Sequence, residues 1–319
     1  MAGRRLSAGE AMPLVSVTLP CYHQLDLARR ALDSIRAQTF TNLDITLLDD
    51  GNSGEYREYI AALGDPRVHY HRNVERLGAM KNMFAAITAG RGDYTLAFHE
   101  DDLLSAGYIA TAIGLMESNA SCAFVACQLR EFTQDPSQAE LTRDLPHPAY
   151  ERFESPADFV RGILCGVEPM FGSIVYRRSA LDGVEPDHAR YATLVDRPFL
   201  LSIMDRGWTA SVLQAPFVWY RHHGDGDTRH LAMTTEHVLH LLRTYREALP
   251  DNWSSDDRAA FFAYTGYWLF ELYRLTPPDQ RPPVWKYLLR AWRQGLYDPR
   301  ARGRFGLRQI QRALLNQTS

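Results

Sequence analysis

The sequence predicts an α/β fold with a doubly wound, mostly parallel sheet flanked by helices and followed by a C-terminal helical extension. Three observations predict this fold. Short apolar runs alternate with helical patterns over residues 1–130, polar segments follow the apolar runs where strands would end, and only helical patterns occur beyond about residue 230. Alternation of strands and helices is typical of a parallel sheet, because each parallel connection requires a crossover.

The first half of the sheet is predicted from four apolar runs and the helical patterns between them. Strands are expected over residues 14–20, 43–48, 68–71 and 94–98. The first helix is expected to start at Asp26, which we predict to be its N-cap. Two further helices are expected over residues 55–63 and 79–89, the second closed by Gly90.

The second half is less regular. Residues 134–150 are rich in proline and polar side chains and are expected to form a loop over the site. Ser155 is expected to cap a helix in which Pro156 takes the first position. A strand is then expected over 172–177, a helix over 194–205, and two strands over 209–213 and 217–221. The C-terminal extension is expected to hold helices over 230–249, 256–275, 284–296 and 306–315.

Composition and charge exclude several classes of protein. The net charge of −3 over 319 residues provides no overall basic field for nucleic acid. No stretch reaches 18 apolar residues, and residues 1–12 lack the apolar core of a signal peptide. Four cysteines without a CxxC pair, namely Cys21, Cys122, Cys127 and Cys165, favour a reduced, cytoplasmic setting over a disulfide scaffold.

Three polar segments follow predicted strands at positions 20–23, 49–51 and 99–102. Ligands of doubly wound sheets bind in the crevice beyond the carboxyl ends of the strands. We therefore expect these three segments to face one crevice. The absence of GxGxxG and GxxxxGK[ST] argues against a dinucleotide or P-loop site in that crevice.

The acidic pairs in two of these segments have two interpretations each. Asp101 and Asp102 could hold Mg²⁺ or Mn²⁺ against a diphosphate, or could form a solvated turn before a helix. Asp49 or Asp50 could accept a hydrogen bond from the imide of uracil or thymine, or could belong to an ordinary Asp-Gly turn. Likewise, His222 and His223 could be metal ligands or surface histidines.

Residues 15–23, VSVTLPCYH, resemble the opening of family 2 glycosyltransferases, and residues 32–40 and 48–53 match the next two blocks of that family. The resemblance continues in order to about residue 230. It includes Asn73, Leu77-Gly78 and Asn82, the segment His99-Glu100-Asp101-Asp102 in place of the family's Asp-x-Asp, Asp196 before Phe199-Leu200, and Tyr220-Arg221-His222-His223. Two departures are His23 in place of asparagine and His99 in place of the first aspartate.

The resemblance implies a GT-A fold, a UDP- or dTDP-sugar donor, Mn²⁺ or Mg²⁺, and inversion at the anomeric carbon. It implies donor binding by Pro20, Tyr22, Asp49, Asp50, Asn82, His99 and Asp102, metal binding by Asp101 and His223, and a general base at Asp196. Residues 1–12 are expected to be disordered, 13–230 to form the catalytic domain, and 231–319 the helical region. Within the catalytic domain, 13–130 would bind the nucleotide and 131–230 the acceptor.

Several alternatives remain at the level of sequence. A nucleotidyltransferase would carry a G-x-G-x-R loop where this chain has residues 20–23, and a non-catalytic sugar-nucleotide-binding protein would need neither Asp101 nor Asp196. Asp196 could instead cap a helix or pair with Arg197. The acceptor could be a carbohydrate, a lipid-linked sugar, a peptide or a small natural product. Residues 285–293 could contact a membrane, mediate homo-oligomerisation, or simply pack against the rest of the protein.

Overall fold

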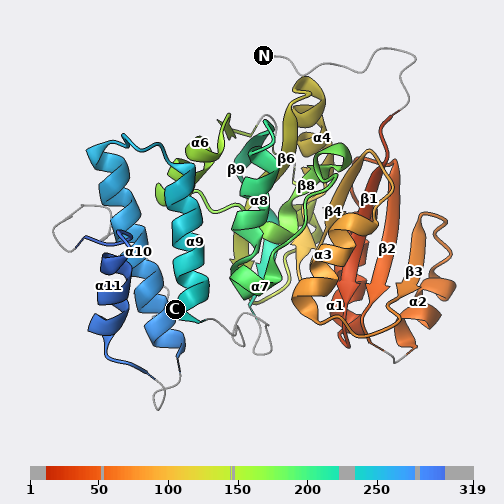
Figure 1. The fold of residues 1–319 in the computed structure, drawn as a ribbon. Coiled ribbons are helices and arrows are strands. Elements are labelled where there is room, and N and C mark those ends of the chain that lie inside the picture. The colour runs from red at the N-terminus through yellow and green to blue at the C-terminus, as the bar shows by residue number, and fades with distance from the viewer. Residues whose placement is uncertain are drawn as a thin grey trace. The chain divides into compact units, whose positions relative to one another are not determined.

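The structure is a computed structural model that describes residues 12–51, 54–143, 145, 148–222, 234–276 and 281–298. Within these residues the central element is a sheet of nine strands (Figure 1). The order is β3-β2-β1-β4-β8-β6-β9-β5, with β7 paired to β9. The strands are β1 Val15–Cys21, β2 Leu43–Asp49, β3 Val68–Arg72, β4 Tyr94–Ala97, β5 Leu103–Leu104, β6 Cys122–Phe132, β7 Tyr150–Phe153, β8 Val175–Arg177 and β9 Thr209–Arg221.

The longest ladders of this sheet are parallel, as the sequence predicts. β3, β2, β1 and β4 run in one direction, and β6 runs parallel to β9. The three-residue strand β8 is antiparallel to both β4 and β6 and joins the two parallel groups. The short strands β5 and β7 are antiparallel to β9. The predicted fold class, a mostly parallel α/β sheet flanked by helices, is therefore confirmed.

Helices cover both faces of the sheet. Helix α1 (Leu25–Arg36) buries Ala28, Ala31, Leu32 and Ile35, which recur at helical spacing and share one hydrophobic cluster with the strands and with α4 (Tyr108–Ser118). Helix α3 (Ala79–Ala89) packs on β1 and β4 but adds no residue to that cluster, which places it on the opposite face (Figure 1). Two shorter helices are α2 (Glu55–Leu63) and α5 (Gln138–Leu141).

Two local predictions are corrected. Asp26 is not the N-cap of α1, because Gln24 occupies that position without a side-chain hydrogen bond. Asp26 lies in the first turn instead, where its charge complements the helix dipole. Gly90 ends α3 as predicted, but with a φ of −64° rather than a left-handed conformation. Its role is close approach, since a Cβ there would lie 2.6 Å from Thr95 Oγ1 and 2.8 Å from Ser16 Cβ.

The two strands predicted at 209–213 and 217–221 form one strand, β9. The pairing with β6 continues across the gap because the register shifts around Gln128, which lies opposite Pro216. A bulge of this kind accommodates a proline that cannot donate to the ladder. In contrast, the strand predicted over 172–177 is shorter, because Phe171–Ser173 form a 3₁₀ turn before β8.

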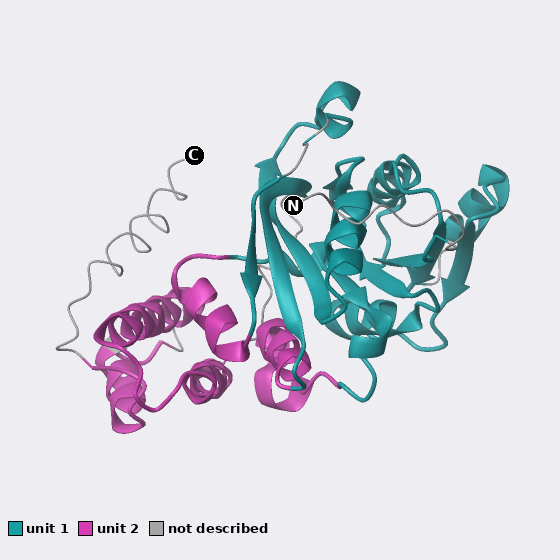
Figure 2. Cartoon of the chain, turned by 90° about the horizontal axis from the view of Figure 1, so that it is seen from above, with its two compact units in different colours: residues 1–154, 168–184, 206–229 teal, residues 155–167, 185–205, 230–319 magenta. Residues whose placement is uncertain are grey.

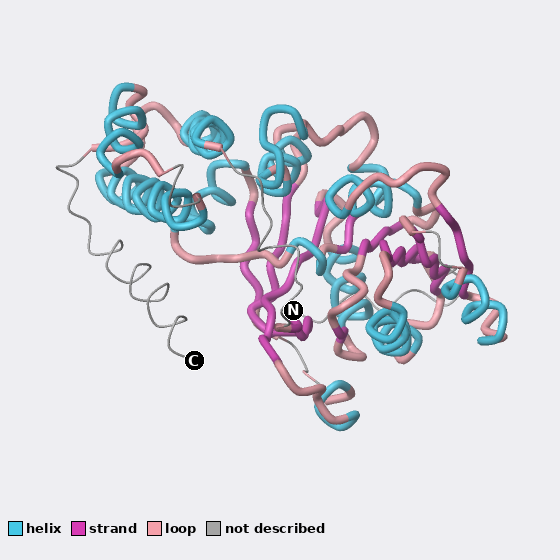
Figure 3. Tube along the Cα trace, turned by 90° about the horizontal axis from the view of Figure 1, so that it is seen from below, coloured by secondary structure: helices cyan, strands magenta, loops and turns pink. Residues whose placement is uncertain are grey.

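The chain divides into two compact units (Figure 2). The first comprises residues 1–154, 168–184 and 206–229, and includes every strand of the described sheet. The second comprises residues 155–167, 185–205 and 230–319, and its described elements are helical (Figure 3). Segments 155–167 and 185–205, which we expected in the catalytic domain, thus group with the C-terminal helices.

The second unit contains α6 Pro156–Leu164, α7 His188–Tyr191, α8 Asp196–Met204, α9 Thr235–Ala248, α10 Ser255–Leu275 and α11 Val284–Arg293. Ser155 caps α6 by accepting a hydrogen bond from the N–H of Asp158, as predicted. The expected helix over 306–315, and all of the expected disordered segment 1–12 except Met12, lie outside the described residues. Among the helices described, none combines the length and apolarity needed to cross a bilayer.

Candidate active site

The polar segments predicted to converge lie at the carboxyl ends of neighbouring parallel strands. The N–H of Asp50 donates to the carbonyl of Cys21 over 2.9 Å, which joins the ends of β1 and β2. The N–H of Asn73 donates to the carbonyl of Asp49 over 2.9 Å and brings in the end of β3. Beyond β4, the segment from His99 to Asp102 follows at the same edge. The parallel pairing of β1 to β4 thus brings these residues together at one edge of the sheet.

A cavity of about 280 Å³ opens at this edge. It is lined by Tyr22, His23, Asp50, Gly51, Arg72, Asn73, Val74 and Arg76. The guanidinium of Arg76 stacks on the ring of Tyr22 at 4.2 Å from its centroid. Two arginines add positive charge to a wall that also carries an exposed aromatic ring. Such a wall suits a ligand with a planar base and negative charge.

Asp50 organises the far side of this cavity. Its Oδ1 accepts hydrogen bonds from Asn73 Nδ2 at 2.8 Å and from the N–H of Leu77 at 2.7 Å, and its Oδ2 accepts one from the N–H of Gly78 at 2.7 Å. Gly78 has a φ of 80°, a conformation that favours glycine. Asp50 therefore stabilises the turn before α3 while its own side chain lines the cavity.

Three other predicted donor-binding residues lie behind the cavity wall. Asp49 is fully buried, and its two oxygens accept hydrogen bonds from Tyr70 Oη and from the N–H of Gly51. Asn82 is 3% exposed and bonds with Asn73 Nδ2 at 2.8 Å. Pro20 pairs with Leu48 inside the sheet. None of the three lines the cavity, so any influence on a ligand there passes through their neighbours.

The acidic turn after β4 brings together three groups with metal-binding chemistry. Ligand atoms of His99, Asp101 and Asp102 lie within 4.8 Å of one another. His99 fits beside Gly172, where a Cβ would lie 3.0 Å from the imidazole Nε2. This narrow contact limits the positions that the ring can adopt.

Asp102 is the buried member of this cluster. Its Oδ1 accepts a hydrogen bond from the N–H of Arg221 at 3.0 Å, while Oδ2 is buried without a hydrogen-bond donor. His99 Nδ1 lies 3.3 Å from Oδ2, within ion-pair distance but outside hydrogen-bond geometry. Burial raises the pKa of Asp102. A buried carboxylate oxygen with no donor, next to a second carboxylate and an imidazole, fits a divalent cation that takes oxygen ligands.

Glu100 is a site residue that the sequence did not single out. Its Oε1 accepts a hydrogen bond from the N–H of Tyr22 at 2.8 Å, and its Oε2 accepts one from Tyr56 Oη at 2.9 Å. Burial raises the pKa of Glu100 to about 7. Through these bonds Glu100 ties the acidic turn to the cavity residue Tyr22. The sequence held no signal for this role, because Tyr56 is 44 residues away from Glu100 in the chain, on α2.

Arg221, at the end of β9, supports the acidic turn. Its Nε donates to the carbonyl of Asp101 at 2.9 Å, in addition to the bond from its N–H to Asp102. Its Nη1 donates to Asp135 Oδ1 at 2.5 Å, and its guanidinium lies 4.5 Å from the ring centroid of Phe132. The side chain is only 9% exposed, so these contacts hold it firmly in place.

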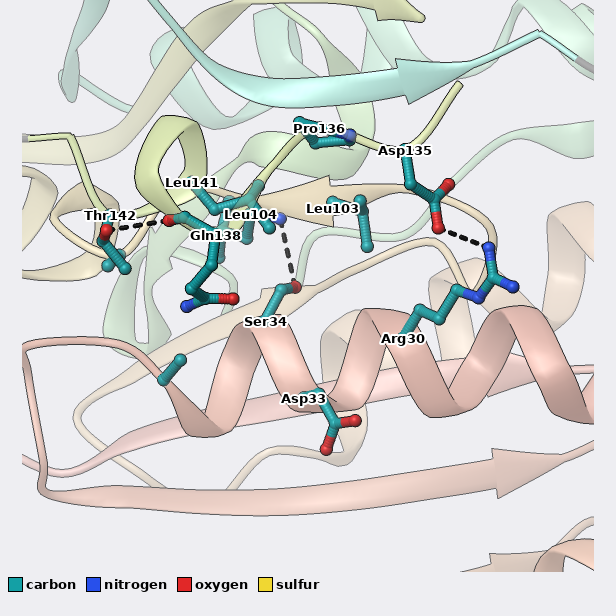
Figure 4. A pocket seen from close by; sticks show the side chains of 12 residues that line it. Arg30, Asp33, Ser34, Leu103, Leu104, Asp135, Pro136, Gln138, Leu141 and Thr142 are labelled. Atoms are coloured by element: carbon teal, nitrogen blue, oxygen red, sulfur yellow. Dashed lines mark hydrogen bonds and ion pairs between the residues drawn. The ribbon is translucent and has the colours of Figure 1, made fainter. Parts of the chain in front are cut away.

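Asp135 also pairs with Arg30 of α1, and both residues line a second cavity of about 200 Å³ (Figure 4). That cavity lies between α1, β5 and the loop that contains α5. Ser34 Oγ accepts a hydrogen bond from the N–H of Leu104 at its wall. None of the predicted site residues lines this cavity. The segment 134–150, predicted to be a loop over the site, therefore contributes Asp135 and the short helix α5 to the wall of this second cavity.

Of the two histidines at the end of β9, the structure describes His222 but not His223. His222 Nε2 lies 3.2 Å from Glu131 Oε2, and its ring makes an edge contact with the ring of Tyr220. It takes no part in the cluster around Asp101. His223, predicted as a metal ligand, lies outside the described residues.

Asp196 begins α8 in the second unit. Its side chain is 26% exposed and forms an ion pair with Arg197 at 3.3 Å. The N-cap position of α8 is Val195, and no side chain caps the helix. Of the two structural interpretations of Asp196, the ion pair is thus present and the helix cap is not. Asp187, another carboxylate of this unit, caps α7 by accepting a hydrogen bond from the N–H of Arg190.

Sequence comparison finds relatives that match part of the chain. The glycosyl transferase WcaA of Escherichia coli strain K12, named for colanic acid biosynthesis, is 32% identical over 92 residues. These residues make up 28% of this chain and 33% of that protein. Other curated relatives, glycosyltransferases of Rickettsia felis and Rickettsia bellii, are matched over 15% and 13% of their lengths. The chain thus matches a third or less of each of these proteins.

Solved structures share the fold over most of the chain. The structure of Staphylococcus aureus TarS 1–349 in complex with UDP-GlcNAc has a TM-score of 0.57 and 13% identity, covering 88% of this chain and 92% of that one. The mannosyltransferase PcManGT of Pyrobaculum calidifontis, in complex with GDP-Man and Mn²⁺, has a TM-score of 0.50 and 17% identity, covering 97% and 88%. At these identities the likeness concerns the fold.

The family model described as glycosyl transferase family 2 matches residues 16–183, just over half of the chain. This range spans β1 to the end of β8 and contains the cavity, Glu100 and the acidic turn. It agrees with the order of motifs from Val15 to Asp102 in the sequence. The chain therefore belongs to glycosyl transferase family 2 and has a GT-A fold.

Proposed function

We propose that this enzyme transfers a sugar from a UDP- or dTDP-sugar to an acceptor hydroxyl, with metal assistance and with inversion at the anomeric carbon. The observation that carries the proposal is the adjacency of two features at one sheet edge. A cavity with an aromatic ring and two arginines is tied by Glu100 to a turn that clusters His99, Asp101 and Asp102. The UDP-GlcNAc and GDP-Man complexes of TarS and PcManGT support a nucleotide-sugar donor.

In this proposal Tyr22 and Asp50 recognise the nucleotide. The ring of Tyr22 offers an apolar face for the base, since Glu100 holds its backbone and Arg76 stacks on its ring. Asp50 lines the cavity and is the candidate acceptor for the imide N–H of the base. Pro20, Asp49 and Asn82 act by shaping this wall, because their contacts lie within the sheet and the turn before α3.

Asp101 and Asp102, with His99, would hold a divalent cation. A Mn²⁺ or Mg²⁺ ion held by these residues would supply positive charge to offset the negative charge of a diphosphate leaving group. Arg221 keeps both aspartates in place through its hydrogen bonds to the Asp101 carbonyl and the Asp102 carboxylate. His223 remains a candidate ligand by its place in the Y-R-x-H motif.

We assign the general base to Asp196. A sugar hydroxyl is a weak nucleophile at neutral pH, so transfer requires a group that accepts its proton. The family resemblance places Asp196 in the segment that carries this base. Its side chain is 26% exposed, so an acceptor hydroxyl could reach the carboxylate, and Arg197 lies 3.3 Å away.

The setting and acceptor are proposed more broadly. The four cysteines of the chain are free thiols, three of them buried, which fits a reduced cytoplasmic compartment. A carbohydrate, a lipid-linked sugar, a peptide and a small natural product all offer a hydroxyl that Asp196 could activate.

A donor panel tests the proposal. Nucleotide release from UDP-, dTDP- and GDP-sugars is measured with Mn²⁺, with Mg²⁺ and with EDTA, and products are identified by mass spectrometry. We expect turnover with a UDP- or dTDP-sugar that EDTA abolishes and that either cation restores. Asp101→Ala should lose turnover while staying folded. Asp26 is 88% exposed in α1, and the control Asp26→Ala should keep turnover. Full turnover of wild type or Asp101→Ala in EDTA would contradict the metal assignment.

A further inference from the structure

Helix α11 buries one stripe of side chains and exposes another. Tyr287 and Ala291 are 4% and 0% exposed and lie toward the rest of the second unit, where α11 packs beside α10 (Figure 1). Trp285 and Trp292 are 58% and 55% exposed. The two tryptophans are seven positions apart in the sequence, which places them about 20° apart around the helix axis, on one stripe. Large apolar side chains exposed side by side indicate a binding surface.

Half-buried Leu288 and Leu289 flank this stripe between the two tryptophans. We call the four residues Trp285, Leu288, Leu289 and Trp292 the tryptophan stripe. The helical spacing puts all four within about 100° of arc, the width of the apolar face of an amphipathic surface helix. Here that face points to solvent, because the packed face of α11 is made by Tyr287 and Ala291.

A basic stripe runs alongside the tryptophan stripe. Lys286, Arg290 and Arg293 are exposed at spacings of four and three residues, and α11 contains no acidic residue. Lys286 Nζ lies 5.9 Å from the centroid of the Trp285 ring, so charge and aromatic surface adjoin. Arg290 forms an ion pair with Glu236 of α9, while Lys286 and Arg293 present their charges on the surface.

The positive charge of this helix continues along the sequence. Residues 284–319 contain eight Lys or Arg side chains and one Asp, although the whole chain has a net charge of −3. The basic character of the protein is therefore concentrated in its last 36 residues. An anionic surface would attract this end of the chain and repel most of the remainder.

We propose that α11 docks on an anionic lipid surface, with the tryptophan stripe in the headgroup region and the basic stripe against lipid phosphates. Tryptophan suits this boundary because its ring is apolar and its indole N–H can still find a polar partner. Lysine and arginine reach headgroups while their stems cover apolar surface. A helix of ten residues, about 15 Å long, lies in such an interface and does not cross it.

A second copy of the chain is a less suitable occupant of this face. In a two-fold dimer, each α11 would meet the same surface of its partner. The basic stripes of both copies would then lie close together without an acidic stripe to oppose them, which costs free energy. The charge of α11 thus complements a lipid surface better than it complements itself. The docking does not depend on which donor or acceptor the enzyme uses.

Vesicle co-sedimentation of the full chain tests the proposal. The probes are phosphatidylcholine vesicles with and without phosphatidylglycerol. We expect binding only to the anionic vesicles, weakened by salt. Trp285→Ser/Trp292→Ser should weaken it about tenfold or more, because the apolar contribution is lost. Lys286→Glu/Arg293→Glu should weaken it more than about fivefold per residue, because each charge is reversed as well as removed.

Matched controls separate this surface from general effects. Tyr150→Ser removes another exposed aromatic ring, 48% exposed in the first unit, and Arg143→Glu reverses an exposed charge there. Both should bind vesicles as wild type does, and circular dichroism should show that every variant is folded. Wild-type binding by both α11 variants would overturn the proposal, as the remaining basic residues would then suffice. A wild-type dimer that the tryptophan variant dissociates, without vesicle binding, would overturn it in favour of self-association.

Discussion

Replacing Asp102 by asparagine separates the metal-binding role of this residue from its structural role. The asparagine oxygen can accept the hydrogen bond that Asp102 Oδ1 now receives from the N–H of Arg221 at 3.0 Å. The amide nitrogen would take the place of Oδ2, 3.3 Å from His99 Nδ1, and could donate to a neutral imidazole. The substitution keeps the size of the side chain and removes its charge.

The expected effect of Asp102→Asn has opposite signs without and with metal. Asp102 Oδ2 is a buried acceptor without a donor, which costs about 1–3 kcal/mol, and burial raises the pKa of the carboxyl. The amide removes that cost, so the metal-free variant should be more stable by about 1–2 kcal/mol, a rise in Tm of about 1.5–3 °C for a chain of this length. Wild type should gain about 2.7 kcal/mol when Mn²⁺ is at 100 times its Kd, and the variant should lose most of this gain.

Thermal unfolding by circular dichroism, in EDTA and across a Mn²⁺ titration, measures both effects. Asp26→Asn, at an exposed position in α1, serves as the control: it should lower the metal-free stability by less than about 1 kcal/mol and keep the full gain from Mn²⁺. A variant that is less stable than wild type in EDTA would show that the Asp102 charge stabilises the fold. A variant that retains the full gain from Mn²⁺ would remove Asp102 from the proposed metal site. Either result refutes the corresponding step of the reasoning.

Three further predictions concern the base, the support of the acidic turn and the stability of the first unit. Asp196→Asn should bind donor nearly as well as wild type and transfer sugar about 10²–10⁴-fold more slowly in single-turnover assays, and transfer near the wild-type rate would exclude Asp196 as the base. Arg221→Met removes the hydrogen bond from Nε to the Asp101 carbonyl and keeps the backbone bond to Asp102. It should weaken Mn²⁺ affinity about 10–100-fold by isothermal titration, and unchanged affinity would show that the guanidinium does not support the metal site. Asp65 is 8% exposed, and hydrogen bonds from Arg67 and then Arg36 lower its pKa. Because the pKa of Asp65 is lower in the folded than in the unfolded state, the ionised carboxylate stabilises the fold at neutral pH. This stability is lost as the pH falls below about 4. Urea unfolding should therefore show Asp65→Asn to be about 1.5–3 kcal/mol less stable than wild type at pH 7, and the difference should shrink in acid. The control Asp33→Asn changes a side chain that is 64% exposed and should cost less than about 1 kcal/mol. A stability difference for Asp65→Asn that does not depend on pH would contradict the assignment.

Much of the fold could be predicted because it depends on local patterns. The strand and helix limits of the first 100 residues agree with the apolar runs to within a residue or two, and α2 and α3 agree at both ends. The acidic turn after β4 and the turn after β2 follow directly from where these strands stop. Patterns were less informative where pairing overrides them, as at Pro216, where the long ladder with β6 carries β9 across a proline.

The sequence by itself determined the family, the order of strands and helices, and which polar segments end at the ligand-binding edge, because each depends on residues that are neighbours in the chain. Only the tertiary structure decided the partners of those residues. Glu100 bonds to Tyr22 across 78 positions, and Arg221 bonds to Asp101 across 120. Tertiary packing also decided that α11 buries Tyr287 and exposes Trp285. The physical reason is that burial and hydrogen-bond satisfaction are properties of contacts between distant segments, and periodicity within one segment cannot specify them.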